Sequence, residues 1–292
     1  MPSTRDIRRR IKSVKNTAQI TKAMQMVAAA KMRKAQQAAV VGRPYAELLN
    51  EIMAQAAVRT VGFDHPLMQT RRVVRRAVIL VGTDRGLCGA LNSNLFREAL
   101  KLDKDTTVFI TAGKKAAQFV ARTKRNLAGE FTYKDTPAFA EGRAISKFAQ
   151  QLFLKGEVDA VDILFPRFIN TLTQKPETIP FLPMGKVAAV TVGVNAAAQE
   201  LGAGLRTDVF EFEPEEETVL GELLPHSLNF QMHQILLETK ASEQSARMVA
   251  MKNATDNAKQ IIKDLTLEYN KLRQANITKE LLEITTAQMA VG

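Results

Sequence analysis

The hydrophobic pattern divides the chain into a helical start, a mixed middle and a helical end. Residues 3–58 repeat apolar or small positions at alternating steps of three and four, which indicates a helix that pairs with another helix. Ser3 is a suitable N-cap, and Gly42 with Pro44 predicts a bend before residues 45–58 continue as helix. The predicted seam is formed by Ile7, Ile11, Val14, Ala18, Thr21, Ala28, Met32, Ala35 and Ala39.

The last part of the chain repeats the same rhythm. Residues 215–290 contain one glycine and one proline, Gly221 and Pro225, both near the start of this region. Small residues recur at successive turns, and such residues let a second helix approach closely. The predicted stripe contains Leu228, Met232, Ile235, Thr239, Ser242, Ala246 and Val249, then Ala250, Ala254 and Ala258, and finally Ile261, Leu265, Tyr269 and Leu272.

The middle of the chain, residues 73–213, alternates short apolar runs with helical stretches. This alternation predicts an α/β domain with a mainly parallel sheet. Two further runs, residues 179–182 and 187–194, are possible edge strands, although Pro180 and Pro183 weaken the first. The predicted strands are Ala77–Val81, Val108–Thr111 and Val161–Phe165, and the predicted helices between them are Asn94–Leu102 and Arg143–Leu154.

Helix length sets the expected shape. At a rise of about 1.5 Å per residue, the first and last helices would reach roughly 80 Å and 100 Å. A compact middle domain of this size has a radius of gyration of only about 14 Å. We therefore expect most of the paired helices to protrude from the α/β domain.

The stretch Thr21–Gln36, TKAMQMVAAAKMRKAQ, has Met and Ala on all sides with Lys and Arg between them. One partner helix covers only one stripe of such a helix. Exposed apolar patches mark interaction surfaces, and Met adapts its shape to different neighbours. The segment is therefore either a surface that another protein surrounds or a core helix of a larger globule.

Charge is unevenly distributed along the chain, which has a net charge of +11. Residues 1–43 hold eleven Lys or Arg against the single acid Asp6, and residues 205–292 hold nine against fourteen Asp or Glu. The basic start could attract the acidic end, an acidic protein or nucleic acid. Nucleic acid is the weaker alternative, because the basic start lacks interleaved aromatic residues and a helix-turn-helix or zinc motif.

A glycine-rich turn, GTDRGLCGALN at residues 82–92, follows a predicted strand and precedes a helix. It matches neither the dinucleotide pattern GxGxxG nor the P-loop. Its glycines could serve close packing, or Asp84 and Arg85 could contact a partner, or the turn could bind phosphate.

Other candidate chemistry is sparse. Cys88 is the only cysteine, which fits a reducing compartment and a small buried side chain more than a nucleophile. His226 and His233 lie seven residues apart without further ligands, so no metal site is expected. No cofactor, no signal peptide and no membrane span are expected either.

Several separated stretches carry a family resemblance. ITKAMQMVAAAKMRKAQ (20–36), TDRGLCGALN (83–92), ARMVAMKNATDNA (246–258) and YNKLRQANITKELLEI (269–284) resemble the gamma subunits of F-type ATP synthases, in the same order along the full chain. The resemblance implies that the two terminal helices form an antiparallel, left-handed coiled coil with an inserted Rossmann-like α/β domain. It also implies a central rotary stalk that couples ion flow to ATP synthesis.

The resemblance further implies partners and contact residues. The partners would be the alpha and beta subunits of the alpha3beta3 hexamer, the epsilon subunit and the membrane c-ring, with ATP chemistry on beta and no catalytic group on this chain. The implied contacts with beta are Lys22, Met24, Lys31, Arg33 and Lys34 on the first helix, Arg85 in the turn, and Arg273, Gln274 and Thr278 on the last helix.

One departure from the family pattern lies near the C-terminus, where Ala287-Gln288 stand in place of the usual Gly-Ala. Alanine favours a helix over glycine, but Gln288 adds a longer polar side chain there. The single cysteine and the lack of a transit sequence favour a bacterial chain, peripheral at the cytoplasmic face of the inner membrane. The alternatives are a coiled-coil nucleic-acid-binding protein with an α/β head and a dinucleotide-dependent enzyme.

Overall fold

The computed structural model describes residues 3–59, 65–184, 213 and 215–291 of the chain. These residues belong to two compact units. The first unit consists of residues 1–28 and 248–292, and the second of residues 29–247. The possible edge strand at 187–194 lies outside the described residues.

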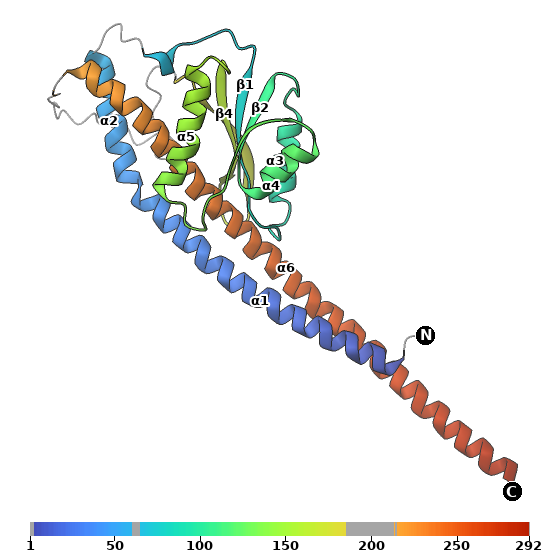
Figure 1. The fold of residues 1–292 in the computed structure, drawn as a ribbon. Helices are drawn as coiled ribbons and strands as arrows, with labels where there is room; N and C mark the ends of the chain where they lie inside the picture. The colour runs from blue at the N-terminus through green and yellow to red at the C-terminus, as the bar shows by residue number, and fades with distance from the viewer. Residues whose placement is uncertain (1–2, 60–64, 185–212, 214, 292) are drawn as a thin grey trace. The chain divides into compact units, whose positions relative to one another are not determined.

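The helices and strands follow the predicted order of helix, α/β region and helix (Figure 1). The long first helix ends before Gly42, and Pro44 lies in the first turn of the next helix, where a missing N–H is tolerated. The bounds are α1 (Thr4–Val41), α2 (Arg43–Arg59), η1 (Pro66–Met68), β1 (Arg76–Val81), α3 (Leu91–Leu100), β2 (Thr107–Ala112), α4 (Lys114–Arg122), β3 (Asn126–Phe131), α5 (Phe139–Leu154), β4 (Ala160–Phe168), β5 (Gln174–Leu182) and α6 (Glu216–Val291).

The first unit is a pair of helical segments from opposite ends of the chain, the start of α1 and the end of α6. Within it, the hydroxyl groups of Thr21 and Thr255 are 2.7 Å apart, and Ile7 and Ala28 are buried. The predicted seam of α1 is therefore correct. Beyond residue 272 the side chains of α6 that the structure describes are exposed.

The buried seam of α6 in the first unit differs from the prediction by one position in places. Met251, Thr255 and Ala258 are its buried residues, whereas the predicted Ile261 is 47% exposed. A stripe that steps by four at every turn drifts around a helix of 3.6 residues per turn, so a seam must mix steps of three and four. Of the predicted alanines at steps of four, Ala258 is buried as predicted, whereas Ala250 and Ala254 are only half-buried beside Met251 and Thr255.

The second unit is built on a five-stranded sheet with the order β3-β2-β1-β4-β5. The pairs among β3, β2, β1 and β4 are parallel, and β5 adds an antiparallel edge to β4. Strand β3 and helix α4 were not predicted from the sequence. We call β1–β5 with α3–α5 the head.

Both faces of the sheet are covered by helices (Figure 1). Successive residues of β1 point to opposite faces: Val78 and Leu80 pack with residues of α3 and α4, and Ile79 and Val81 pack with residues of α5 and α6. A smaller cluster joins α2 to α6 through Leu49, Met53, Leu224 and Phe230.

Candidate partner interface

The first helix presents apolar side chains outside its seam. Ala28 is 1% exposed, yet Met26 and Ile20 on the same helix are each 60% exposed and Val27 is 55% exposed. Within the first unit, then, Met and Ala face both the partner helix and the outside. Exposed apolar groups at this density indicate a surface that another protein covers.

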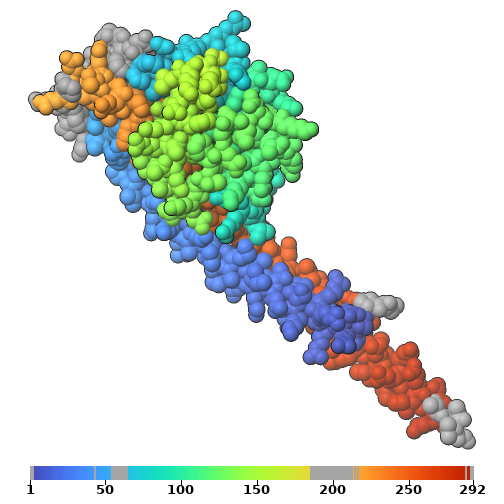
Figure 2. Space-filling model, viewed as in Figure 1, coloured from blue at the N-terminus to red at the C-terminus, as the bar shows by residue number. Residues whose placement is uncertain are grey.

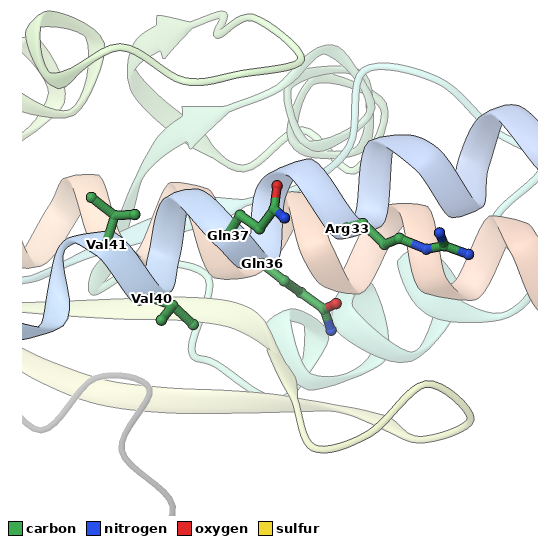
Figure 3. Close-up of a pocket in the computed structure, with 5 residues that line it drawn as sticks. All are labelled: Arg33, Gln36, Gln37, Val40 and Val41. Carbon is green, nitrogen blue, oxygen red and sulfur yellow. The ribbon is translucent and has the colours of Figure 1, made fainter.

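Three of the predicted contact residues of α1 are exposed, namely Lys22, Arg33 and Lys34, and Met24 is half-buried. Farther along α1, in the second unit, Arg33 shares a shallow hollow with Val40 and Val41 (Figure 3). Val41 is 78% exposed, so this part of α1 also combines a cation with uncovered apolar carbon. The hollow is lined by Arg33, Gln36, Gln37, Val40 and Val41.

The predicted contact residues of α6, Arg273, Gln274 and Thr278, are all exposed. The Thr278 hydroxyl donates to the Gln274 carbonyl at 3.0 Å, a contact within the helix that leaves the other two side chains available. Exposed large apolar residues surround them, and the helix continues through residues 287–288 despite the departure from Gly-Ala. These apolar residues are Leu267, Ile277, Leu281, Leu282, Ile284 and Met289.

The turn between β1 and α3 is held by hydrogen bonds and presents Arg85 to the outside. The Asp84 carboxylate accepts a hydrogen bond from the Lys114 amide at 3.0 Å and so occupies the N-terminus of α4. The Thr83 hydroxyl donates to the Arg85 carbonyl at 2.8 Å. Leu87 has a positive φ of 62° and is 61% exposed. This geometry fits a partner contact better than a phosphate site, because a carboxylate already lies at the helix N-terminus.

A network of buried charges, which sequence reasoning missed, ties this turn to α6. Arg247 donates to the Gly86 carbonyl at 3.1 Å and to Glu243 Oε1 at 2.8 Å. Lys240 Nζ lies 3.0 Å from Glu243 Oε2. Charged residues are normally assigned to the surface. One signal in the sequence could have located these buried charges: between residues 238 and 247, polar residues occupy every face of α6.

The same network includes one predicted contact residue. Lys31 Nζ lies 2.6 Å from Asp135 Oδ2, and Lys240 Nζ lies 3.8 Å from Asp135 Oδ1. The hydrogen bond from Lys31 is the largest cause of the lowered pKa of Asp135, with the charge of Lys240 adding to it. Lys31 therefore already has an internal partner, although 41% of its side chain stays exposed and remains open to a second contact.

Comparison with known proteins identifies the chain's relatives. Residues 3–291 match the family model described as ATP synthase. The ATP synthase gamma chain of Opitutus terrae is 49% identical and that of Methylacidiphilum infernorum 45% identical, each over the whole of both chains. The chain belongs to the ATP synthase gamma chain family.

Solved structures support the fold of this family member. The chain resembles a chain of the Euglena gracilis mitochondrial ATP synthase, with a TM-score of 0.68, 21% identity and coverage of 99% of this chain and 94% of that one. It also resembles a chain of the Tetrahymena thermophila central stalk and c-ring, with a TM-score of 0.59, 25% identity and coverage of 80% and 99%. The predicted family, fold class and gamma-subunit role are confirmed, and nothing supports the nucleic-acid alternative.

The remaining candidates from the sequence are Cys88 and the two histidines of α6, His226 and His233. Cys88 is buried, as predicted, and burial raises the pKa of its thiol, which keeps it protonated. The part of the chain that the structure describes contains no cluster of three or more metal-ligating His, Cys, Asp or Glu side chains. Among the described helices, none combines the length and apolarity that a membrane crossing requires.

We expect His233 to make the stability of the fold depend on pH. It packs against the Phe139 ring, with centroids 5.8 Å apart, and burial lowers its pKa, opposed by the charge of Glu141. Because the folded-state pKa is below the unfolded value, the neutral ring stabilises the fold above about pH 6.5, and this contribution is lost as pH falls below it. We expect His233→Gln to reduce the loss of thermal midpoint between pH 7.5 and pH 5.5. Equal losses for both proteins would contradict this.

Proposed function

We propose that this chain is the rotating central stalk of a bacterial F-type ATP synthase, inside an alpha3beta3 hexamer and in contact with the epsilon subunit and the c-ring. It would transmit torque between the c-ring and the hexamer. ATP chemistry would occur on beta, with no catalytic group on this chain, and the complex would lie at the cytoplasmic face of the inner membrane. The observation that carries this proposal is the excess of exposed apolar residues on α1 and α6. The chain's relatives, which match it over its full length, are ATP synthase gamma chains.

The chemistry of the two exposed helix segments fits such a role. A rotating stalk must meet three similar faces in turn without locking onto one. Met and Ala make shallow, adaptable contacts, and exposed cations such as Lys22 and Lys34 can be attracted to acidic loops at defined angles. We assign the contacts with beta to Lys22, Met24, Lys31, Arg33, Lys34, Arg85, Arg273, Gln274 and Thr278.

Co-expression tests the proposal directly. Alpha and beta subunits from a related bacterium, such as Opitutus terrae, should form a stable, ATP-hydrolysing assembly with this chain. The matched omission of this chain should leave no stable complex with comparable activity. An assembly whose composition and ATPase rate do not depend on the chain would refute the proposal.

Met24 is the site where an added charge should interfere most. Met24→Lys places an ammonium on a half-buried position of a helix that already carries Lys22 on one side and Lys31, Arg33 and Lys34 farther along. Because Lys and Met have similar helix propensities, we expect the helix to persist. The new charge should bind acidic loops of beta and lower the number of ions pumped per ATP hydrolysed in membrane vesicles. Gln19→Lys, at an exposed position of the same helix, is the control, and an equal pumping ratio in all three proteins would count against the assignment.

A further inference from the structure

One stretch of α6, from Gln234 to Arg247, is buried and yet polar. Its side chains belong to the second unit and pack within that unit. Buried helices are normally apolar, and charged residues are rarely fully buried unless they are paired. The buried polar residues are Gln234, Glu238, Thr239, Lys240, Ser242, Glu243, Gln244, Ser245 and Arg247.

The charges of this stretch continue into neighbouring elements as one series of contacts. We call Lys31, Asp135, Lys240, Glu243 and Arg247 the ion chain. Lys240 is 1% exposed and Glu243 is 2% exposed. Between them they connect Asp135, in the segment between β3 and α5, with Arg247. The Lys240 ammonium also lies 4.7 Å from the centre of the Tyr133 ring, a favourable cation–π distance.

Each end of the ion chain reaches a different part of the second unit. At one end, Asp135 binds Lys31 of α1 at 2.6 Å. At the other end, Arg247 donates to the carbonyl groups of Arg85 and Gly86 in the turn after β1. Two helices and two segments of the head are thus joined through five side chains.

Stability alone does not account for this arrangement. Well-packed apolar side chains usually stabilise a protein as much as a buried ion network of similar volume, or more. Among the neighbouring residues of α6, Thr239, Ala241 and Ser242 are small, and the low ridges that small side chains form on a helix resist sliding poorly. An ion pair, in contrast, is satisfied in one position only. A slip of one residue moves each side chain by about 1.5 Å along the axis and 100° around it, which would break every link.

We propose that the ion chain fixes the axial and rotational register of α6 on the head. Through the pair of Lys31 with Asp135, it also holds α1 against the same part of the head. Lys240, Glu243 and Asp135 are then positioning residues: they touch no substrate, and they hold the angle at which the helices carry torque. The torque-bearing consequence rests on the proposed function, whereas the register itself is a property of the chain alone.

Distances between spin labels on the full-length chain measure the register. In a Cys88→Ser background, one label is attached at Lys147 on α5 and the other at Glu222 on α6, both exposed residues of the second unit. The unmodified ion chain should give one narrow distance distribution. Glu243→Gln keeps the shape of the side chain but removes its charge, and should broaden the distribution or displace it by up to about one helical turn, ~5 Å.

Three further variants make the result specific. Asp135→Asn changes a residue that is about half exposed, so the chain should fold, and it should displace a label at Gln37 of α1 relative to Lys147. Glu243→Asp retains the charge and should restore most of the narrow distribution. Glu98→Gln removes the acid of an exposed ion pair between α3 and Lys101, the residue that follows α3, and should leave both distances unchanged.

The outcomes separate positioning from simple stabilisation. If Glu243→Gln and Asp135→Asn keep the unmodified distances while their thermal midpoints fall, the ion chain only stabilises the fold and the proposal is wrong. If Glu243→Gln does not fold, Asp135→Asn decides by the same criterion. In the assembled complex, Glu243→Gln should lower the ions pumped per ATP while ATP hydrolysis continues. Failure of the complex to form with the unmodified chain would refute the proposed function and leave the distance test valid.

Discussion

Replacement of Gly113 by alanine should cause one of the largest losses of stability available to a single methyl group in this chain. Gly113 has φ 101° and ψ 140°, a conformation that side chains do not tolerate. A Cβ atom there would lie 2.5 Å from the Gly82 carbonyl oxygen and 2.9 Å from its carbon. Backbone strain of about 1–3 kcal/mol and overpacking of about 1–3 kcal/mol should combine to lower the thermal midpoint by roughly 10 °C.

The same methyl group at Gly86 provides the control. Nothing lies within 4 Å of a Cβ atom built on Gly86, and its backbone is not in the left-handed region, because its φ is not among the positive values. Circular dichroism should therefore show a thermal midpoint for Gly86→Ala within a few degrees of the parent. If Gly113→Ala and Gly86→Ala have the same thermal midpoint, the close approach of Gly113 to Gly82 does not limit which residue can occupy position 113.

The contact that Gly113 permits explains how the fold positions the turn with Arg85. Gly82 and Gly113 end neighbouring parallel strands, and the Lys115 amide donates to the Thr83 carbonyl at 2.9 Å. Asp84 then caps α4. An alanine at 113 would push this turn away from α4, so loss of stability and displacement of the predicted contact residue should occur together.

The sequence predicted most of this fold because its strongest patterns come from large buried surfaces. Strands β1, β2 and β4 lie inside the sheet and are mostly apolar and buried, as expected for parallel strands covered on both faces. Strand β3 has the sequence NLAGEF at an edge and is mostly exposed, so it has neither a continuous run nor a clear alternation. Helix α4 has only nine residues, which is shorter than the roughly 10–12 residues at which an apolar pattern is normally assigned to a helix.

The exposed apolar residues of the candidate interface could also be predicted from a local sequence pattern, whereas the ion pairs inside the second unit could not. Met26 and Val27 are apolar outside a seam, which a pattern can show without coordinates. The pairing of Lys31 with Asp135 joins residues 104 positions apart, and no local pattern contains that distance. Lys240 and Glu243 were missed because a charge is assigned to the surface unless its partners are known.

Removal of the Glu243 side chain should have an effect as large as that at Gly113, and far larger than removal of its partner. Glu243→Ala would leave the buried ammonium of Lys240 and the guanidinium of Arg247 without their shared carboxylate. Breaking a buried ion pair in this way costs about 3–5 kcal/mol, which should lower the thermal midpoint by roughly 10 °C.

Lys240→Met makes the matched test, because it removes a charge without leaving one unpaired. Glu243 would keep Arg247 at 2.8 Å, and Asp135 would keep Lys31 at 2.6 Å. Methionine fills a similar volume and adapts to the Tyr133 ring through its sulfur, so the midpoint should change by only a few degrees in either direction. Circular dichroism melts of the two variants therefore distinguish two arrangements. If the ion chain depends on its central carboxylate, Glu243→Ala should lower the thermal midpoint much more than Lys240→Met. If the ion pairs are independent, the two variants should lower it equally. If the two losses are equal, the carboxylate of Glu243 is not the shared centre of the network.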